Sequence, residues 1–202
     1  MQNDYRKMKV GKFMGKVISI GNQGFDTIRE KECFFVDKTN FIKEWWENED
    51  SITLITRPRR FGKTLNMSMM ECFFSNKYSD RGDLFEGLSI WHEEKYRRIQ
   101  GTYPVLFLSF AAVKSDNLND SKQQIKNQIV RLYEENRYLV EGKILSDNEK
   151  NAFQNITGNM GDVEAVEALN VLCVYLARYY DKKVIILLDE YDTPMQEAYI
   201  NG

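Results

Sequence analysis

The chain has 202 residues, 43% of them hydrophobic and 13% aromatic, which is enough apolar material for a filled core and excludes a disordered chain. Its 28 Lys and Arg residues against 30 Asp and Glu residues give a formal net charge of −2, which argues against a protein whose main work is coating nucleic acid. The sequence has no CxxC pair and no apolar run of the ~20 residues that span a membrane, so it predicts a cytoplasmic protein with neither a zinc site nor membrane contact.

The first part of the chain changes character near residue 33. Residues 1–32 are polar with scattered glycines, and they are expected to form an irregular N-terminal arm. Residues 33–36 are predicted to form a short strand, and Asp37 is a reasonable N-cap for the helix that follows. The apolar stripe of this helix consists of Phe41, Ile42, Trp45 and Trp46.

A second strand and helix are predicted directly afterwards. Residues 51–57, with the sequence SITLITR, are rich in β-branched side chains and are predicted to form a buried strand. A helix is expected to begin at Gly62-Lys63-Thr64. Its inner face would carry Leu65, Met69, Cys72 and Phe73. Residues 75–103 are polar and are predicted to contain short helical pieces at most.

The second half of the chain repeats the alternation of strand and helix. Residues 103–110, YPVLFLSF, form a continuous apolar run, as expected of a strand buried on both faces. An amphipathic helix is predicted from the spacing of Ile125, Ile129, Leu132 and Tyr133. Ser146 and Glu149 form a capping box for a shorter helix. A long helix is marked by Val163, Val166, Leu169, Cys173, Leu176 and Tyr180. Residues 184–188 are predicted to form another strand buried on both faces.

This order predicts an α/β fold with a mainly parallel sheet flanked by helices. In such sheets, ligands bind outside the carboxyl ends of the strands. The GKT of residues 62–64 and the DEYD of residues 189–192 both follow such ends, so we expect them to face one crevice.

Residues 57–64, RPRRFGKT, match the phosphate-loop pattern GxxxxGK[ST] except that Arg57 replaces the first glycine. Gly62 lets the backbone approach a phosphate, Lys63 reaches the β- and γ-phosphates, and the Thr64 hydroxyl helps to hold Mg²⁺. The residues expected to contact the nucleotide are Arg59, Arg60, Phe61, Gly62, Lys63, Thr64 and Leu65. The alternative is a basic patch or localisation signal, but such patches do not normally interrupt a strand–helix unit.

The second motif supplies the carboxylates that a metal–triphosphate site needs. Asp189 ends an apolar run and is placed to orient the Mg²⁺ shell, and Glu190 is the candidate that positions or deprotonates an attacking water. The alternative is a solvated acidic turn, which is common after strands. The predicted catalytic residues are therefore Lys63 and Glu190, and the predicted metal ligands are Thr64 and Asp189.

Several segments together resemble the bacterial AAA-ATPase-like family from about Gly21 to Asp192. They read FFVDKTNFIKEWW, TLITRPRRFGKTLNMSMMECFF, DLFEGLSIW, YPVLFLSF and LLDEYD. The resemblance implies a P-loop ATPase of the additional-strand (ASCE, AAA-like) class, with Lys63 and Thr64 at Walker A positions and Asp189 and Glu190 at Walker B positions. Members of this family often carry a PD-(D/E)XK nuclease-like domain after the ATPase.

The resemblance further implies that residues 33–202 form the N-terminal part of an ATPase domain that is truncated after Walker B, before a strand with a polar sensor residue. The leading hypothesis is an ATP- and Mg²⁺-dependent ATPase that drives an attached effector, with weak or no turnover in this segment alone. A nucleotide-binding scaffold without turnover and a P-loop kinase are the alternatives. Nucleic-acid contacts through a further domain and a homo-oligomer are both compatible with these hypotheses.

Some residues leave two interpretations open. Residues 37–39 either border the adenine or form a helix cap with an exposed lysine. Trp45 and Trp46 fit the core and surface of one helix better than a base-stacking platform, and His92 is most simply a surface histidine.

Overall fold

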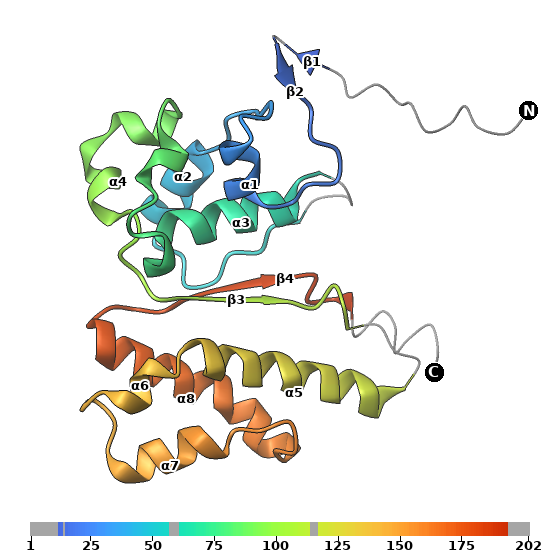
Figure 1. Cartoon of the computed structure of the whole chain (residues 1–202), viewed down its shortest axis with the longest axis vertical. Helices are drawn as coiled ribbons and strands as arrows, with labels where there is room; N and C mark the ends of the chain where they lie inside the picture. Colours follow the sequence, from blue (N-terminus) through green and yellow to red (C-terminus); the bar gives the residue numbers. More distant parts are fainter. Residues whose placement is uncertain (1–11, 14, 57–60, 114–116, 194–202) are drawn as a thin grey trace, which may run out of the picture. The chain divides into compact units, whose positions relative to one another are not determined.

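The structure is a computed structural model that describes residues 12–13, 15–56, 61–113 and 117–193 (Figure 1). The chain folds as two compact units, Met1–Thr102 and Tyr103–Gly202. No helix among the described residues is long and apolar enough to cross a membrane.

The first unit is a small hairpin followed by helices. Strands β1 (Lys12–Phe13) and β2 (Lys16–Val17) pair antiparallel. The α-helices are α1 (Phe25–Glu30), α2 (Asn40–Asn48), α3 (Lys63–Phe74) and α4 (Glu94–Ile99). Three short 3₁₀ helices lie between α3 and α4, namely η1 (Asn76–Tyr78), η2 (Gly82–Phe85) and η3 (Ser89–His92). The expectation of short helical pieces between residues 75 and 103 is confirmed.

Aromatic side chains fill the core of the first unit. Phe25 of α1 stacks on Phe85 at 5.0 Å between ring centroids, and Phe73 of α3 meets Phe85 edge-on at 5.1 Å. Trp45 and Trp46 both pack on Phe74. Because offset and edge-on pairs add to the burial of these large rings, this cluster holds α3 in place. Helix α3 is therefore a firm support for the residues at its N-terminus.

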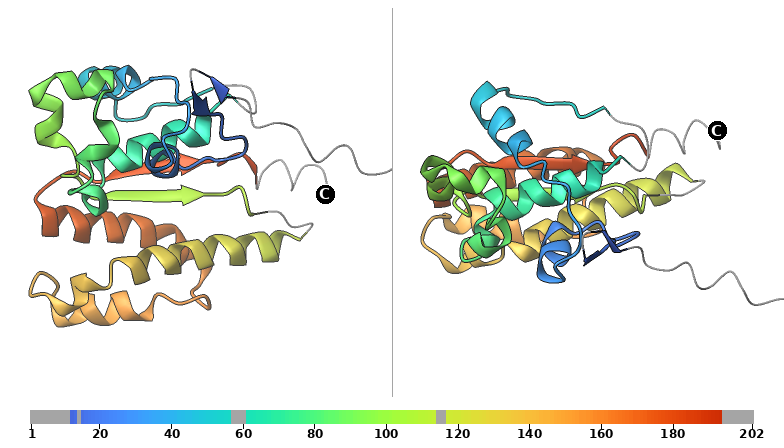
Figure 2. Two further views of the ribbon diagram at one scale, coloured as in Figure 1. Left: turned by 45° about the horizontal axis from the view of Figure 1, so that its top comes forward. Right: turned by 90° about the horizontal axis from the view of Figure 1, so that it is seen from above.

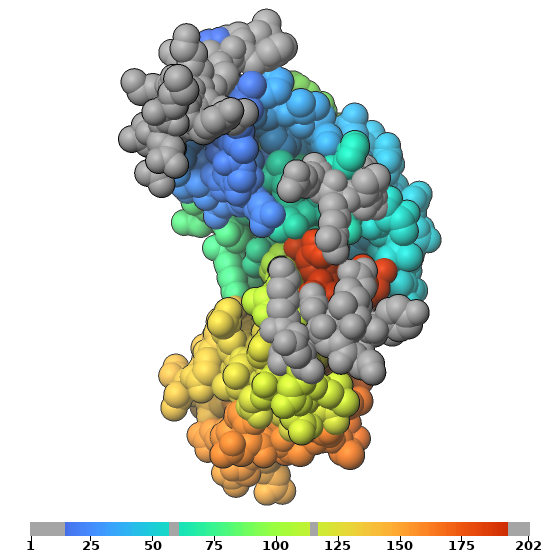
Figure 3. Space-filling model, turned by 90° about the vertical axis from the view of Figure 1, so that its right-hand side faces the viewer, coloured from blue at the N-terminus to red at the C-terminus, as the bar shows by residue number. Residues whose placement is uncertain are grey.

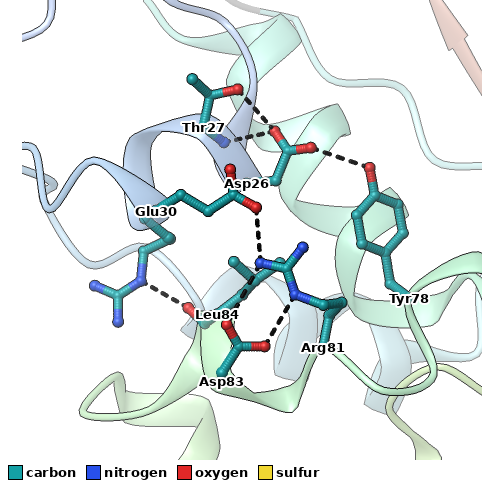
Figure 4. Close-up of polar contacts among 8 residues, drawn as sticks. Asp26, Thr27, Glu30, Tyr78, Arg81, Asp83 and Leu84 are labelled. Atoms are coloured by element: carbon teal, nitrogen blue, oxygen red, sulfur yellow. Dashed lines mark hydrogen bonds and ion pairs between the residues drawn. The ribbon is translucent and has the colours of Figure 1, made fainter.

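Polar contacts fasten α1 to the segment after α3 (Figure 4). Arg81 pairs with Glu30 at 2.8 Å and with Asp83 at 3.1 Å, and the Tyr78 hydroxyl donates to Asp26. Arg29 donates to the carbonyl oxygen of Leu84 at 2.7 Å. These groups are largely at the surface, so each contact adds little to the free energy of unfolding. Their main effect is to fix how α1 is oriented against the short elements after α3.

The second unit is a parallel strand pair with helices. Strands β3 (Val105–Ser109) and β4 (Ile185–Asp189) pair in parallel, with Val105 opposite Ile185 and Ser109 opposite Asp189. The helices between them are α5 (Leu118–Glu135), α6 (Tyr138–Glu141), α7 (Asp147–Asn155) and α8 (Asp162–Tyr180). All four lie on one side of the strand pair (Figures 1 and 2). This arrangement is an α/β fold with a small parallel sheet flanked by helices, and it is compatible with a P-loop fold.

The core of the second unit lies between β3 and the helices. Leu106 and Leu108 of β3 pack with Leu132 of α5 and with Leu172 and Leu176 of α8. Helices α5 and α8 lie side by side and reach the surface of the unit (Figure 3). The predicted capping box is present, with the Ser146 and Glu149 side chains each bonding the other's backbone N–H.

Two predicted strands are absent from the described residues. Phe34 donates a hydrogen bond to the Val17 carbonyl, but residues 33–36 form no strand. Residues 51–56 form no strand either, and Ile52 is 90% exposed. A β-branched sequence becomes a strand only where a neighbouring backbone completes the ladder, and no described strand pairs with either segment.

Three smaller predictions also differ from the structure. Helix α2 begins at Asn40 with Thr39 as its N-cap, and Asp37 lies before it. Strand β4 is not buried on both faces, because Ile186 and Leu188 are 41% and 39% exposed. Val163 and Val166 are on α8 as predicted, but each is 76% exposed.

Candidate functional site

The first candidate segment is the N-terminus of α3. Gly62 precedes the helix with φ 75°, in the left-handed region, and Lys63 and Thr64 occupy the first turn and are half-buried. Leu65 is also half-buried, and Phe61 is 61% exposed. The other predicted nucleotide contacts, Arg59 and Arg60, lie outside the described residues, as does Arg57.

The N-terminus of α3 has the features of an anion site. A helix leaves its first backbone N–H groups without helical partners, and a side chain at the N-cap usually accepts from one of them. Gly62 has no side chain to do so, and the first turn contains no acidic residue. The N–H groups, the positive end of the helix dipole and the Lys63 ammonium thus favour one bound anion.

Asn66, one turn into α3, is a residue that the sequence did not single out. It is 4% exposed, and its side-chain nitrogen has no hydrogen-bond partner among the described residues. A buried donor without a partner costs about 1–3 kcal/mol, so proteins seldom keep one without a reason. Its position close behind Lys63 and Thr64 associates it with the phosphate-loop segment, although no sequence motif marks it.

The second candidate segment is the carboxyl end of β4 in the second unit. Asp189 is the last residue of the strand and is 3% exposed. Its backbone oxygen accepts from Phe110 at 2.9 Å, which fixes the strand end. Ser109 is paired with Asp189 in the register and is half-buried, so a hydroxyl and a carboxylate end the two strands together. The available signal for Ser109 was that it is the polar residue next to the end of the apolar run YPVLFLSF.

Glu190 follows Asp189 in an uncommon backbone conformation. Its φ is 53°, and the side chain is half-buried. The Thr193 hydroxyl donates to the Glu190 carboxylate at 3.4 Å, and the Thr193 N–H donates to the Glu190 carbonyl oxygen at 3.0 Å. Thr193, which the sequence did not single out either, therefore holds the turn that presents Glu190.

Asp37 is a structural residue. One carboxylate oxygen accepts from the backbone and hydroxyl of Thr39, at 2.9 and 2.7 Å. The other accepts from the backbone and hydroxyl of Ser89, at 2.7 and 2.6 Å. Burial alone would raise the pKa of Asp37, but the hydrogen bonds from Ser89 and Thr39 outweigh it and hold the pKa below its ordinary value. This carboxylate is saturated and joins the segment before α2 to η3.

Some of the weaker candidates can now be placed. Lys38 and His92 are exposed, as expected of surface residues. Trp45 and Trp46 are both half-buried and are both in ring contact with Phe74. These contacts favour the interpretation that Trp45 and Trp46 pack on the protein core over the interpretation that they stack on a base.

The structure thus brings the predicted residues together in two groups. Phe61 to Leu65 gather at the start of α3 in the first unit, and Asp189 and Glu190 gather at the end of β4 in the second. Within the described parts of the chain, no group of three or more His, Cys, Asp or Glu residues could hold a metal by itself.

Comparison with known proteins gives one family. The model described as "Predicted AAA-ATPase" matches residues 19–202. An "Uncharacterized protein in vnfD 5′region" of Azotobacter chroococcum mcd 1 is 28% identical over 183 residues, which is 89% of this chain and 30% of that protein. The chain thus spans less than a third of the length of this relative, and no solved structure matches it significantly. Because the family match covers nearly the whole chain, this protein belongs to the predicted AAA-ATPase family.

Proposed function

We propose that this chain is part of a P-loop module that binds ATP with Mg²⁺ and hydrolyses it, with weak or no turnover in this segment alone. The observation that carries the proposal is Gly62, which introduces the uncapped N-terminus of α3 in the left-handed conformation and is followed directly by Lys63 and Thr64. Family membership supports nucleotide binding. The pairing of Asp189 and Glu190 at a strand end supports hydrolysis.

The residues of the first unit act on the phosphates. The N–H groups of the first turn of α3 donate to phosphate oxygens, and Gly62 allows the close approach because it has no side chain. Lys63 neutralises charge that builds up on the β- and γ-phosphates as the terminal bond breaks. Arg59, Arg60, Phe61 and Leu65 complete the proposed nucleotide contacts.

The donor set suits Mg²⁺. This ion prefers oxygen ligands and is usually held by one or two protein groups together with substrate phosphates and water. Thr64 offers a hydroxyl, Asp189 offers a buried carboxylate, and no larger acidic cage is present among the described residues. We assign these two residues to the ion, whose bound charge would neutralise the phosphates.

Glu190 is the proposed water-positioning group. Its half-buried carboxylate is held by Thr193, so its orientation is restricted. A positioned general base contributes roughly 10²–10⁴-fold in rate. Asp189 and Glu190 are adjacent in sequence, and the turn after β4 lets the two side chains serve different atoms.

The finer classification follows from the same residues. We propose that residues 33–202 belong to the N-terminal part of an additional-strand ATPase domain. Of the residues 1–32 that were expected to form an arm before it, Phe25–Glu30 form α1 and pack in the core of the first unit. The relative from A. chroococcum is much longer than this chain, which is consistent with a further domain in such proteins. ATP hydrolysis would then drive an attached effector, for example a nuclease-like domain.

Replacing Lys63 by Ala tests nucleotide binding. The variant loses the cation on the β/γ-phosphates, so we expect ATP affinity to fall by at least about tenfold, as measured by calorimetry. Lys31→Ala is the matched control, because Lys31 is an exposed lysine of the same unit. Equal ATP affinity in wild type and Lys63→Ala, with both proteins folded, would refute the assignment. Tight binding without measurable turnover in the full-length protein would favour the scaffold alternative.

A further inference from the structure

Helix α8 presents an apolar stripe on the face opposite to the core. Val163 and Val166 are each 76% exposed, Val174 is 54% exposed and Val171 is 36% exposed. The buried face of the same helix carries Ala168, Leu172, Tyr175 and Leu176, so the core does not need these valines. Exposed apolar residues that gather on one helix face mark a contact surface.

The spacing of this stripe is symmetric about Asn170. Along one face the residues are Val163, Val166, Asn170, Val174 and Ala177, in steps of three, four, four and three. These are the steps of a seam between two packed helices. Reversing the direction of the helix about Asn170 leaves the pattern unchanged, which is the condition for a two-fold symmetric contact between antiparallel copies.

We infer that α8 is a self-association surface, on which α8 of a second copy packs antiparallel across a two-fold axis at Asn170. Val166 then meets Val174 of the second copy, and Val163 meets Ala177 of the second copy. The two Asn170 side chains meet on the axis, where their amides can pair with each other. A single asparagine in an apolar seam fixes the register in this way.

The charges beside the stripe favour the antiparallel direction. Glu164 and Glu167 are exposed in the first half of α8. Arg178 is exposed near its end, where it also pairs with Glu149 of its own chain at 2.9 Å. Antiparallel packing places Glu164 near Arg178 of the second copy. Parallel packing would instead place each glutamate beside the same glutamate of the second copy. Like charges at such positions are destabilising, so the parallel alternative is disfavoured.

The contact between the two α8 helices is small, so we expect the dimer to be weak. A single helix pair buries less surface than the ~1,600 Å² of a standard stable interface. The dimer is therefore expected to dissociate in the micromolar range, and β-branched valines contribute because they lose little side-chain entropy on packing.

Sedimentation equilibrium of the whole chain tests the inference. We expect a reversible monomer–dimer equilibrium for wild type and at least about tenfold weaker association for Val166→Glu and for Val174→Glu. The control is Val36→Glu, because Val36 is 58% exposed in the first unit and should leave association unchanged. A monomer at all accessible concentrations, or a dimer that both charged variants leave intact, would overturn the proposal.

Disulfide trapping tests the direction, in a Cys173→Ser background that removes the native thiol of this helix. Asn170→Cys should form an intermolecular disulfide on mild oxidation, because the two residues meet on the axis. Val163→Cys is the matched control on the same stripe, since the antiparallel geometry separates the two copies of residue 163 by about 21 Å. Efficient trapping at both residues would show a parallel pair, in which each residue meets its own copy. Trapping at residue 163 alone would show a different register, and either result would contradict the inference.

Discussion

At the scale of single residues, the two candidate segments share a left-handed backbone. Gly62 has φ 75° and Glu190 has φ 53°. The conformation costs glycine little, whereas a residue with a side chain loses about 1 kcal/mol or more. Three other non-glycine residues have positive φ among those described, Glu32, Glu49 and Asp181, and each follows the end of a helix. Glu190 follows a strand instead, so helix termination does not explain its conformation, which agrees with the functional role that we propose for it.

Replacing Gly62 by Ala should weaken both the fold and the proposed site. No atom of the described, non-adjacent residues lies within 4 Å of the position that a Cβ would take, so the expected cost of about 1 kcal/mol comes from the backbone. Chemical denaturation should show this loss, and calorimetry should show weaker ATP binding. Gly142→Ala is the control, because Gly142 also has room for a methyl group but has φ −78°. Equal stability losses in the two variants would contradict the backbone argument.

Glu190 allows stability and catalysis to be separated. Glu190→Gly relieves the left-handed strain, so we expect the free energy of unfolding to rise by about 1 kcal/mol while ATP turnover falls. Glu190→Gln keeps the strain and should lower turnover roughly 10²–10⁴-fold with ATP binding retained.

Glu49→Gly is the matched control for strain, because Glu49 has φ 52° at the end of α2. It should raise stability by a similar amount and leave turnover unchanged. Unaltered turnover in Glu190→Gln would remove Glu190 from the proposed chemistry.

At the scale of elements, Asp37 joins the start of α2 to η3 through four hydrogen bonds. Asp37→Asn should lower the free energy of unfolding by about 1 kcal/mol at pH 7, because the amide cannot accept all four bonds as well as the carboxylate does. Because the folded pKa lies below the unfolded value of about 3.9, this contribution is present above that pH. It should be lost as the pH falls through the folded pKa.

Unfolding measured between pH 7 and pH 2.5 checks this dependence. The difference in stability between wild type and Asp37→Asn should shrink on acidification. Asp80→Asn, which changes another exposed carboxylate of the same unit, should show no such difference at any pH. A difference that stays constant with pH would mean that the charge of Asp37 is not what stabilises the junction.

Helices could be predicted from the sequence better than strands. The spacing of Ile129 and Leu132 predicted α5, and Ser146 with Glu149 predicted the start of α7, because helix formation depends on residues close in sequence. Residues 33–36 and 51–56 have strand composition but form no strand, because pairing depends on a distant backbone that composition does not reveal.

The candidate site was predictable where a motif has a fixed local geometry. Gly62, Lys63 and Thr64 lie at a helix N-terminus as the motif requires, and Asp189 ends a strand, although one face of that strand is exposed. Asn66 and Ser109 could not be assigned in this way. Asn66 is a candidate only because burial leaves its amide nitrogen without a hydrogen-bond partner among the described residues. Ser109 is a candidate only because the strand register places it opposite Asp189.

At the scale of the whole molecule, the proposal assigns Asp189, in the second unit, to the Mg²⁺ ion. Asp189→Asn tests this, because it removes a buried negative charge from the second unit while leaving the start of α3 unchanged. We expect ATP binding to lose most of its dependence on Mg²⁺, as measured by titration with and without the ion. Asp192→Asn is the control in the same turn. A full Mg²⁺ dependence in Asp189→Asn would show that this carboxylate does not serve the ion.

The cysteines give each unit its own reporter of opening. Cys72 in the first unit is 0% exposed, and burial raises the pKa of its thiol to about 12. Only about 10⁻⁴ of such thiols would be ionised at pH 8, so labelling requires the unit to open. Cys173 in the second unit is half-buried, and burial raises its pKa as well. In a Cys33→Ser background, slower labelling of Cys72 in the presence of a nucleotide would show that the nucleotide stabilises the first unit against opening, and the same comparison at Cys173 tests the second unit.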